Sequence, residues 1–188
     1  MLTVGRSGSS LVAHIFREHG LWLGPTRPGD EFNPLGYFEN SGIKERMKKI
    51  HGFDVSGPMP KTIPGWRDIV RDIMKSQGYE GGLWGLKTGV HFWNVWGEFN
   101  PTIIKIMRHR DSIVQSYRRY GGVFPEHGQG FIDRGLARLE SLPGIEIDTD
   151  ALVSGRRDQI ERSISASGLK YNEQVVDSIV NPEFWHGC

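Results

Sequence analysis

The sequence is almost devoid of cysteine, since Cys188 is the single cysteine among 188 residues. A lone cysteine excludes an internal disulfide framework, an iron–sulfur cluster and a cysteine-based zinc site, and it is typical of a reducing compartment. No apolar run approaches ~18 residues, so we expect no membrane span. The first residues lack a basic region and a long apolar region, so we expect no secretion signal and a cytoplasmic location.

The sequence also lacks an excess of positive or negative charge. The 23 Lys and Arg residues against 22 Asp and Glu residues leave a net charge of +1. This balance disfavours nucleic acid as a partner, because such binding requires many phosphates to be neutralised. Any anion site must therefore be a local cluster. The seven histidines are scattered and no pair has the H-E-x-x-H spacing, so we predict no metal site.

Short apolar segments alternate with amphipathic ones along the chain. Thr102–Met107 is the strongest predicted strand, because it is β-branched and follows Pro101. Shorter apolar runs lie at Met1–Val4, Gly82–Thr88 and Ile145–Ile147. Helical periodicity is present at residues 9–19, 44–50, 65–77, 91–99, 111–120, 130–142, 155–167 and 172–180. This alternation predicts an α/β fold with a doubly wound parallel sheet in three α/β/α layers. We expect one domain over residues 1–188, with a loop and helix insertion at 24–64.

The segment Gly5–Ser10 (GRSGSS) is a candidate anion-binding loop. It lies between the first strand and the first helix, where backbone N–H groups and the positive end of the helix dipole favour a phosphate. Ser9 or Ser10 is the expected N-cap. A plain strand-to-helix turn would have the same pattern. The loop has no Gly-Lys pair, so it is not a Walker A loop, and it lacks the G-x-G-x-x-G dinucleotide motif.

A second basic segment follows the strongest strand. Arg108 begins it, and Ser116 lies eight residues later in the next helix. The carboxyl ends of parallel strands share one edge of the sheet, so we expect Arg108 close to the Gly5–Ser10 loop. A guanidinium and a hydroxyl together can bind a phosphate. The alternative is that Arg108 and Arg110 pair with Asp111 or cap a helix.

Together the two segments resemble the donor-binding motifs of bacterial-type sulfotransferases that use 3′-phosphoadenosine 5′-phosphosulfate (PAPS). The chain is similar to that family also at Asn33–Asn40 (NPLGYFEN) and Gly85–Thr88 (GLKT). The resemblance implies a P-loop-NTPase-like sulfotransferase fold, PAPS as sulfuryl donor, 3′-phosphoadenosine 5′-phosphate (PAP) as product, and no metal. The donor-binding residues that it implies are Arg6, Ser7, Gly8, Ser9, Ser10, Arg108 and Ser116.

The resemblance also suggests catalytic residues. Lys87, which we expect at the end of a strand, is the candidate cation beside the leaving oxygen, with Arg6 able to share that task. Animal members of the family carry a histidine base after Lys-Thr, but Gly89 stands there in this sequence. Other members use a glutamate in the loop after the first helix. Our first candidate base is therefore Glu39, followed by Glu31 and then by His91.

The acceptor is less constrained by the sequence. Insertion 24–64 is expected to form the acceptor site, and the short chain predicts an open site suited to a bulky acceptor such as a glycan end or a lipid head group, although a small molecule also fits. The aromatic residues Phe92, Trp93, Trp96 and Phe99 have spacing typical of core. Two alternative functions stay open: a P-loop nucleotide or small-molecule kinase, and a non-catalytic nucleotide-binding relative.

Overall fold

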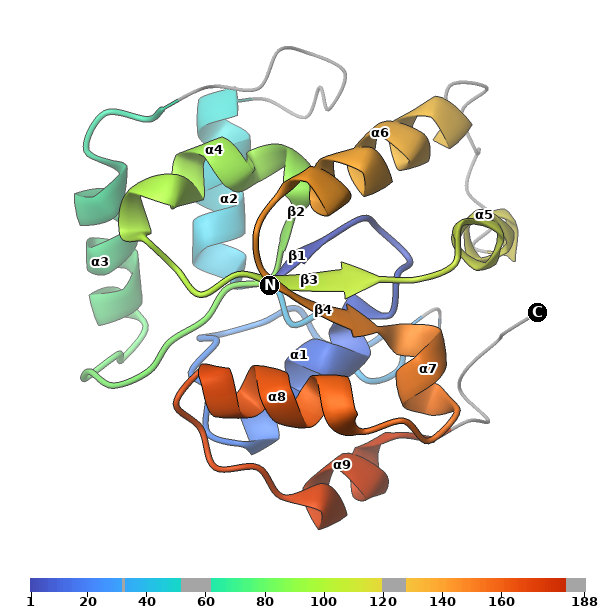
Figure 1. Cartoon of the computed structure of the whole chain (residues 1–188). Coiled ribbons are helices and arrows are strands. Elements are labelled where there is room, and N and C mark those ends of the chain that lie inside the picture. The colour runs from blue at the N-terminus through green and yellow to red at the C-terminus, as the bar shows by residue number, and fades with distance from the viewer. Residues whose placement is uncertain (32, 52–61, 120–127, 182–188) are drawn as a thin grey trace.

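The computed structural model describes residues 1–31, 33–51, 62–119 and 128–181. Within these residues, four strands form one all-parallel sheet in the order β2–β1–β3–β4 (Figure 1). The strands are β1 (Leu2–Thr3), β2 (Thr88–Gly89), β3 (Ile104–Met107) and β4 (Ile145–Asp148). Leu2 lies opposite Thr88 on one side and opposite Lys105 on the other. The predicted α/β class, with a parallel sheet and helices on both faces, is confirmed.

The helices follow the predicted ranges closely. Their bounds are α1 (Ser9–Glu18), α2 (Ser41–His51), α3 (Trp66–Ser76), α4 (Trp93–Trp96), α5 (Arg110–Arg119), α6 (Gly128–Ser141), α7 (Thr149–Val153), α8 (Asp158–Ala166) and α9 (Glu173–Ile179). Short 3-10 turns flank α4 at Val90–Phe92 and Gly97–Phe99. Among the described residues, no helix combines the length and the apolar character needed to cross a bilayer.

Two local predictions are wrong, and one helix was not predicted. Gly8, and neither Ser9 nor Ser10, is the N-cap of α1, because the loop turns into the helix through a left-handed residue (φ 79°). Lys87 does not end a strand; it immediately precedes the two-residue β2. Helix α7 was not predicted, and it begins because the Asp148 carboxylate accepts hydrogen bonds from two of its backbone N–H groups. Residues 52–61 of the predicted insertion lie outside the described residues.

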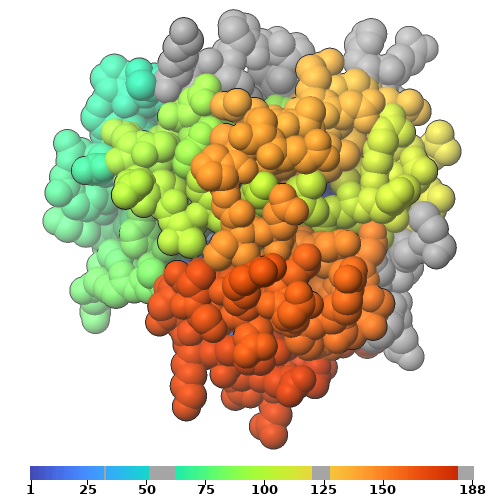
Figure 2. Space-filling view, viewed as in Figure 1, coloured from blue at the N-terminus to red at the C-terminus, as the bar shows by residue number. Residues whose placement is uncertain are grey.

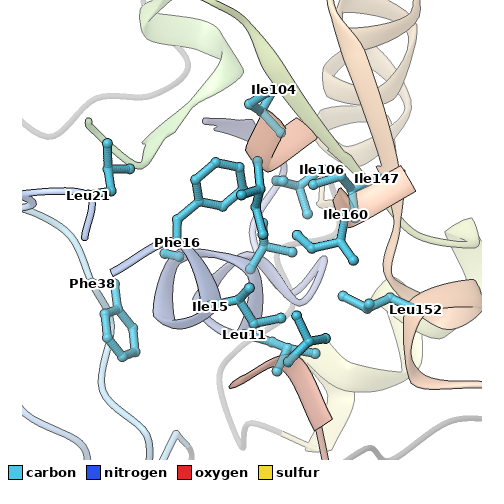
Figure 3. Close-up of a cluster of buried hydrophobic side chains, with 14 of the residues drawn as sticks. Leu11, Ile15, Phe16, Leu21, Phe38, Ile104, Ile106, Ile147, Leu152 and Ile160 are labelled. Carbon is cyan, nitrogen blue, oxygen red and sulfur yellow. The ribbon is translucent and has the colours of Figure 1, made fainter. Parts of the chain in front are cut away.

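The core is split between the two faces of the sheet. Along β3, Ile104 and Ile106 point to the face covered by α1, α8 and α9, where they meet Ile15 and Phe16 of α1 (Figure 3). On the other face, Leu2 and Val4 pack with residues of α5 and α6. Side chains of successive strand residues alternate between faces, so β3 contributes to both clusters, with Met107 packed against the second.

A third cluster lies beside the sheet and joins α2, α3 and α4. Its centre is Trp66, whose ring meets that of Trp96 edge to face at 5.4 Å. Trp96 is buried, and Phe92, Trp93 and Phe99 pack against the same cluster, so the core prediction for these aromatics is confirmed. In Figure 2 this green region lies to the left of the orange and red residues of α7, α8 and α9. The cluster holds α2 alongside the segment that leads into β2.

The strand order positions the functional region. From β1 the chain goes to β2 on one side, and it later returns to β3 on the other side of β1. In open α/β sheets such a reversal leaves a crevice beyond the carboxyl ends of the two diverging strands, and ligands bind there. The topology therefore predicts a ligand crevice after Thr3 and Met107, where the Gly5–Ser10 loop and Arg108 begin.

Candidate functional site

The Gly5–Ser10 loop has two features that cost folding free energy unless a bound ligand or a close packing contact compensates for them. Arg6 has a φ of 66°, a left-handed conformation that a non-glycine residue rarely adopts. The N-cap Gly8 supplies no side-chain hydrogen bond to α1. The first N–H groups of a helix have no intrahelical acceptor, so this helix end presents donors and a positive dipole to an anion.

Two other residues of the loop hold it in place from inside. The Ser7 side chain is fully buried, and its hydroxyl lies 2.5 Å from the Thr3 hydroxyl. The carbonyl of Ser7 accepts a hydrogen bond of 2.9 Å from Thr149. A Cβ at Gly5 would lie 2.2 Å from the Tyr117 hydroxyl oxygen, so a side chain there would force Tyr117 to move. The Ser7 side chain and carbonyl are therefore both tied to the rest of the protein.

Arg108 and the loop meet as the shared sheet edge predicts. The Arg108 Nη1 donates to the Arg6 carbonyl at 3.2 Å, and the Arg6 Nε donates to Ser116 Oγ at 3.0 Å. These contacts join residues that are 102 and 110 positions apart in the chain. The two guanidinium groups thus lie in one region at the crevice. Two cationic side chains in one region make the local potential more positive, which favours an anionic ligand.

The partner of Arg108 differs from the sequence-based alternative. Its Nε donates to Asp150 Oδ1 at 3.2 Å, and the Arg108 side chain is only 5% exposed. Arg110, in contrast, pairs at the surface with Asp133 and Asp111. Asp150 also accepts from the His109 backbone N–H, so α7 fixes the start of the segment after β3. Arg108 is therefore held on two sides.

Lys87 reaches the loop from the other flank. Its side chain is 5% exposed, and its Nζ donates to Ser10 Oγ at 3.0 Å and to the Tyr37 carbonyl at 2.5 Å. Glu39 Oε1 lies 3.8 Å from the same Nζ, and the other Glu39 oxygen pairs with Lys44. Burial lowers the pKa of Lys87 to about 8, and the negative charge of Glu39 opposes this shift.

The lowered pKa of Lys87 predicts a pH-dependent stability. Since the folded-state pKa of about 8 lies below the ordinary 10.5, the unfolded chain binds more protons in this window. Lys87 alone should therefore raise the free energy of unfolding by about 2 kcal/mol between pH 7.5 and 9.5. Urea denaturation at both pH values measures the change. Lys87→Met should remove this increment and the exposed-lysine control Lys49→Met should keep it; identical pH dependence in both variants would contradict the assignment.

Ser10 is oriented by two donors. Its Oγ accepts from Asn33 Nδ2 and from Lys87 Nζ, each at 3.0 Å. The same Asn33 Nδ2 donates to the Gly36 carbonyl at 2.7 Å, which identifies that atom as the amide nitrogen. A hydroxyl has two lone pairs, and both are occupied here. With both lone pairs occupied, the Ser10 hydroxyl can make a further hydrogen bond only as a donor, which is the role that an anion requires.

A pocket of about 180 Å³ lies between α2 and the segment Leu86–Gly89. Glu39 and Lys87 both line it, so the first candidate base and the candidate cation share one cavity. Lys44, from the predicted 24–64 insertion, contributes to the wall, and Phe92 contributes an aromatic face. The described part of that insertion thus lines a cavity next to the anion-binding loop.

The other two candidate bases lie elsewhere. Glu31 is exposed, in the turn between Asp30 and Asn33. His91 packs against Phe131 of α6 with ring centroids 4.3 Å apart. Burial, together with the charge of Arg134, lowers the pKa of His91. The structure therefore brings Glu39, of the three candidates, next to Lys87.

Sequence reasoning gave no role to several residues that hold the site. Asn33 orients Ser10, Asp150 holds Arg108, and Tyr117 lies over Gly5. Asn33 stands in the Asn33–Asn40 motif, so that motif was a signal for it. Tyr117 and Asp150 act through contacts with residues far away in the chain, and no local sequence pattern predicts such contacts.

Comparison with known proteins identifies no relative of this chain. No protein-family model matches the chain, and no curated protein or solved structure matches it. Within the described residues, no group of three or more His, Cys, Asp or Glu side chains is arranged to hold a metal ion.

Proposed function

We propose that this protein is a sulfotransferase that moves a sulfuryl group from PAPS to an acceptor hydroxyl, with a P-loop-like sulfotransferase fold. The observation that carries the proposal is the convergence of Arg6, Ser116 and Arg108 at the switch point of the sheet. These residues come from the two segments that resemble the family's donor-binding motifs. Their convergence supports a ligand with two separate anionic groups, as PAPS has.

The proposed donor site divides into two parts. The loop backbone, together with the Ser10 hydroxyl, would bind the 5′-phosphosulfate at the positive end of α1. Arg108 and Ser116 would bind the 3′-phosphate through charge-assisted and neutral hydrogen bonds. The Arg6 guanidinium lies between these parts because it donates to Ser116. Both parts are pre-positioned by contacts within the protein, which lowers the cost of ordering them on binding.

The proposed reaction is an in-line displacement. The bond between sulfur and the bridging oxygen breaks as a bond between sulfur and the acceptor oxygen forms, and the electron pair leaves on the 5′-phosphate of PAP. Lys87 would stabilise the charge that develops on that phosphate oxygen. Glu39 would receive the acceptor proton as general base. The 3.8 Å separation of Glu39 and Lys87 supports this division, because both ends of the transfer must lie close together.

Titration with PAP tests the proposal directly. Thermal-shift and calorimetric measurements should detect binding without added metal, with a stabilisation of about 2.7 kcal/mol at 100 times Kd. Parallel titrations with ATP, with and without Mg²⁺, provide the comparison. Binding of Mg²⁺–ATP in place of PAP would favour the kinase alternative. Absence of binding by either ligand would contradict a nucleotide-dependent function for this crevice.

A further inference from the structure

We propose that the pocket between α2 and Leu86–Gly89 selects an acceptor whose reacting end is one six-membered ring that carries both a hydroxyl and an anionic substituent. This inference rests on the proposed function, since it names the class of molecule that would receive the sulfuryl group. It narrows the expected bulky acceptor to one whose reacting ring enters this pocket.

The size of the pocket sets the first limit. Its volume is about 180 Å³. A protein cavity of roughly 150 Å³ is known to hold one benzene molecule. One six-membered ring therefore fits, whereas a fused ring system or a disaccharide would extend out of the pocket.

The apolar part of the wall favours the faces of a ring. Ile43 and Met47 line it from α2, and Leu86 and Phe92 line it from the opposite side. Ile43 and Met47 are four residues apart, so they lie on the same side of the helix. They are buried at 2% and 7% exposure, so their positions are fixed by packing. A ring inserted here would contact aliphatic and aromatic carbon on both faces.

The charged part of the wall favours an anion. Lys44 and Lys48 also line the pocket from α2, again four residues apart, next to the apolar pair. With Lys87 they give three cations against one carboxylate, that of Glu39. Lys44 already pairs with Glu39. Lys48 pairs with Glu45 at 2.8 Å, but the Glu45 side chain is 59% exposed. Such an exposed pair is weak, and the Lys48 ammonium group has three N–H donors, so it can bind an anionic substituent in the pocket in addition to its partners in the protein.

These positions determine how the acceptor lies. Its hydroxyl must approach Glu39 and Lys87, at the end of the pocket next to Ser10. Lys48 lies one helical turn beyond Lys44, so the anionic substituent belongs on the side of the ring remote from the hydroxyl. A para-substituted ring has this shape.

Binding of matched probes tests the inference without requiring turnover. The probes are 4-hydroxyphenylacetate, its neutral counterpart 4-hydroxyphenylacetamide, and the linear 6-hydroxyhexanoate, each titrated by NMR in the presence and absence of PAP. We expect the ring carboxylate to bind about fivefold more tightly than the amide, as a partly exposed ion pair allows. Lys48→Gln should abolish this preference, and Lys49→Gln, on the exposed side of α2, should keep it.

The outcomes separate the two proposals. Equal binding of acid and amide, or an unchanged preference in Lys48→Gln, would overturn the anionic requirement even if PAP binds. Tighter binding of 6-hydroxyhexanoate than of the ring acid would overturn the ring requirement. If the expected charge preference is found but PAP does not bind, the sulfotransferase proposal fails and the pocket keeps its ligand class.

Discussion

Glu39→Gln is expected to lower kcat for sulfuryl transfer by about 10²- to 10⁴-fold, the usual contribution of a general base. Glutamine keeps the size of the side chain and a hydrogen-bonding oxygen but cannot take a proton. The Kd of PAP should change little, because the proposed donor-binding groups lie on Arg6–Ser10, Arg108 and Ser116. Single-turnover assays with PAPS and calorimetry with PAP measure the two quantities separately.

The same substitution at Glu31, the other glutamate candidate, distinguishes between the two possible bases. Glu31→Gln should leave kcat near the wild-type value, because Glu31 is exposed and Glu39 is the glutamate that lies beside Lys87. Glu140→Gln, on the exposed side of α6, controls for the loss of one negative charge. A large loss in Glu31→Gln with full activity in Glu39→Gln would reverse the assignment. PAP binding with no turnover in the wild-type protein would favour the non-catalytic alternative.

Arg108→Ala is expected to weaken PAP binding by about 100-fold, because a buried charge-assisted hydrogen bond to the 3′-phosphate is lost. Adenosine 5′-monophosphate lacks that phosphate, so its Kd should be nearly the same in the variant and the wild type. Calorimetry with both nucleotides isolates the contribution of the 3′-phosphate. Arg110→Ala, two residues away and paired at the surface with Asp133, is the matched control.

A structural side effect of Arg108→Ala must be separated from loss of a ligand contact. The variant leaves Asp150 and the Arg6 carbonyl without the Arg108 guanidinium. Ser116→Ala is a smaller change on the same proposed subsite, and it should weaken PAP binding by several-fold without affecting the monophosphate. If both variants weaken the binding of the two nucleotides equally, Arg108 maintains the loop and does not contact the 3′-phosphate.

The local sequence was sufficient to predict those strands and helices whose conformation is favoured by residues close together in the chain. β3 lies within the predicted Thr102–Met107 because β-branched residues between a proline and a basic turn favour a strand. Helix α3 coincides with the predicted 65–77 to within one residue at each end. The placement of Arg108 near Gly5–Ser10 also followed from sequence, since parallel strands have their carboxyl ends at one edge.

Contacts between distant segments could not be derived in this way. Lys87 was assigned to the end of a strand, but its side chain reaches the loop from a position just before β2. Which carboxylate holds Arg108 was decided by α7, 42 residues away, and not by the adjacent Asp111. Each of these pairings depends on the relative positions of separate elements, which tertiary packing sets.

The sequence by itself determined the α/β class, the parallel sheet and the position of the Gly5–Ser10 loop between β1 and α1, because short-range periodicity and turn chemistry specify them. Only the tertiary structure decided that Asn33 and Lys87 orient the Ser10 hydroxyl and that Glu39 lies beside Lys87. The physical reason is that hydrogen bonds and burial between segments tens of residues apart depend on how the elements pack. The residue pattern within one segment does not determine that packing.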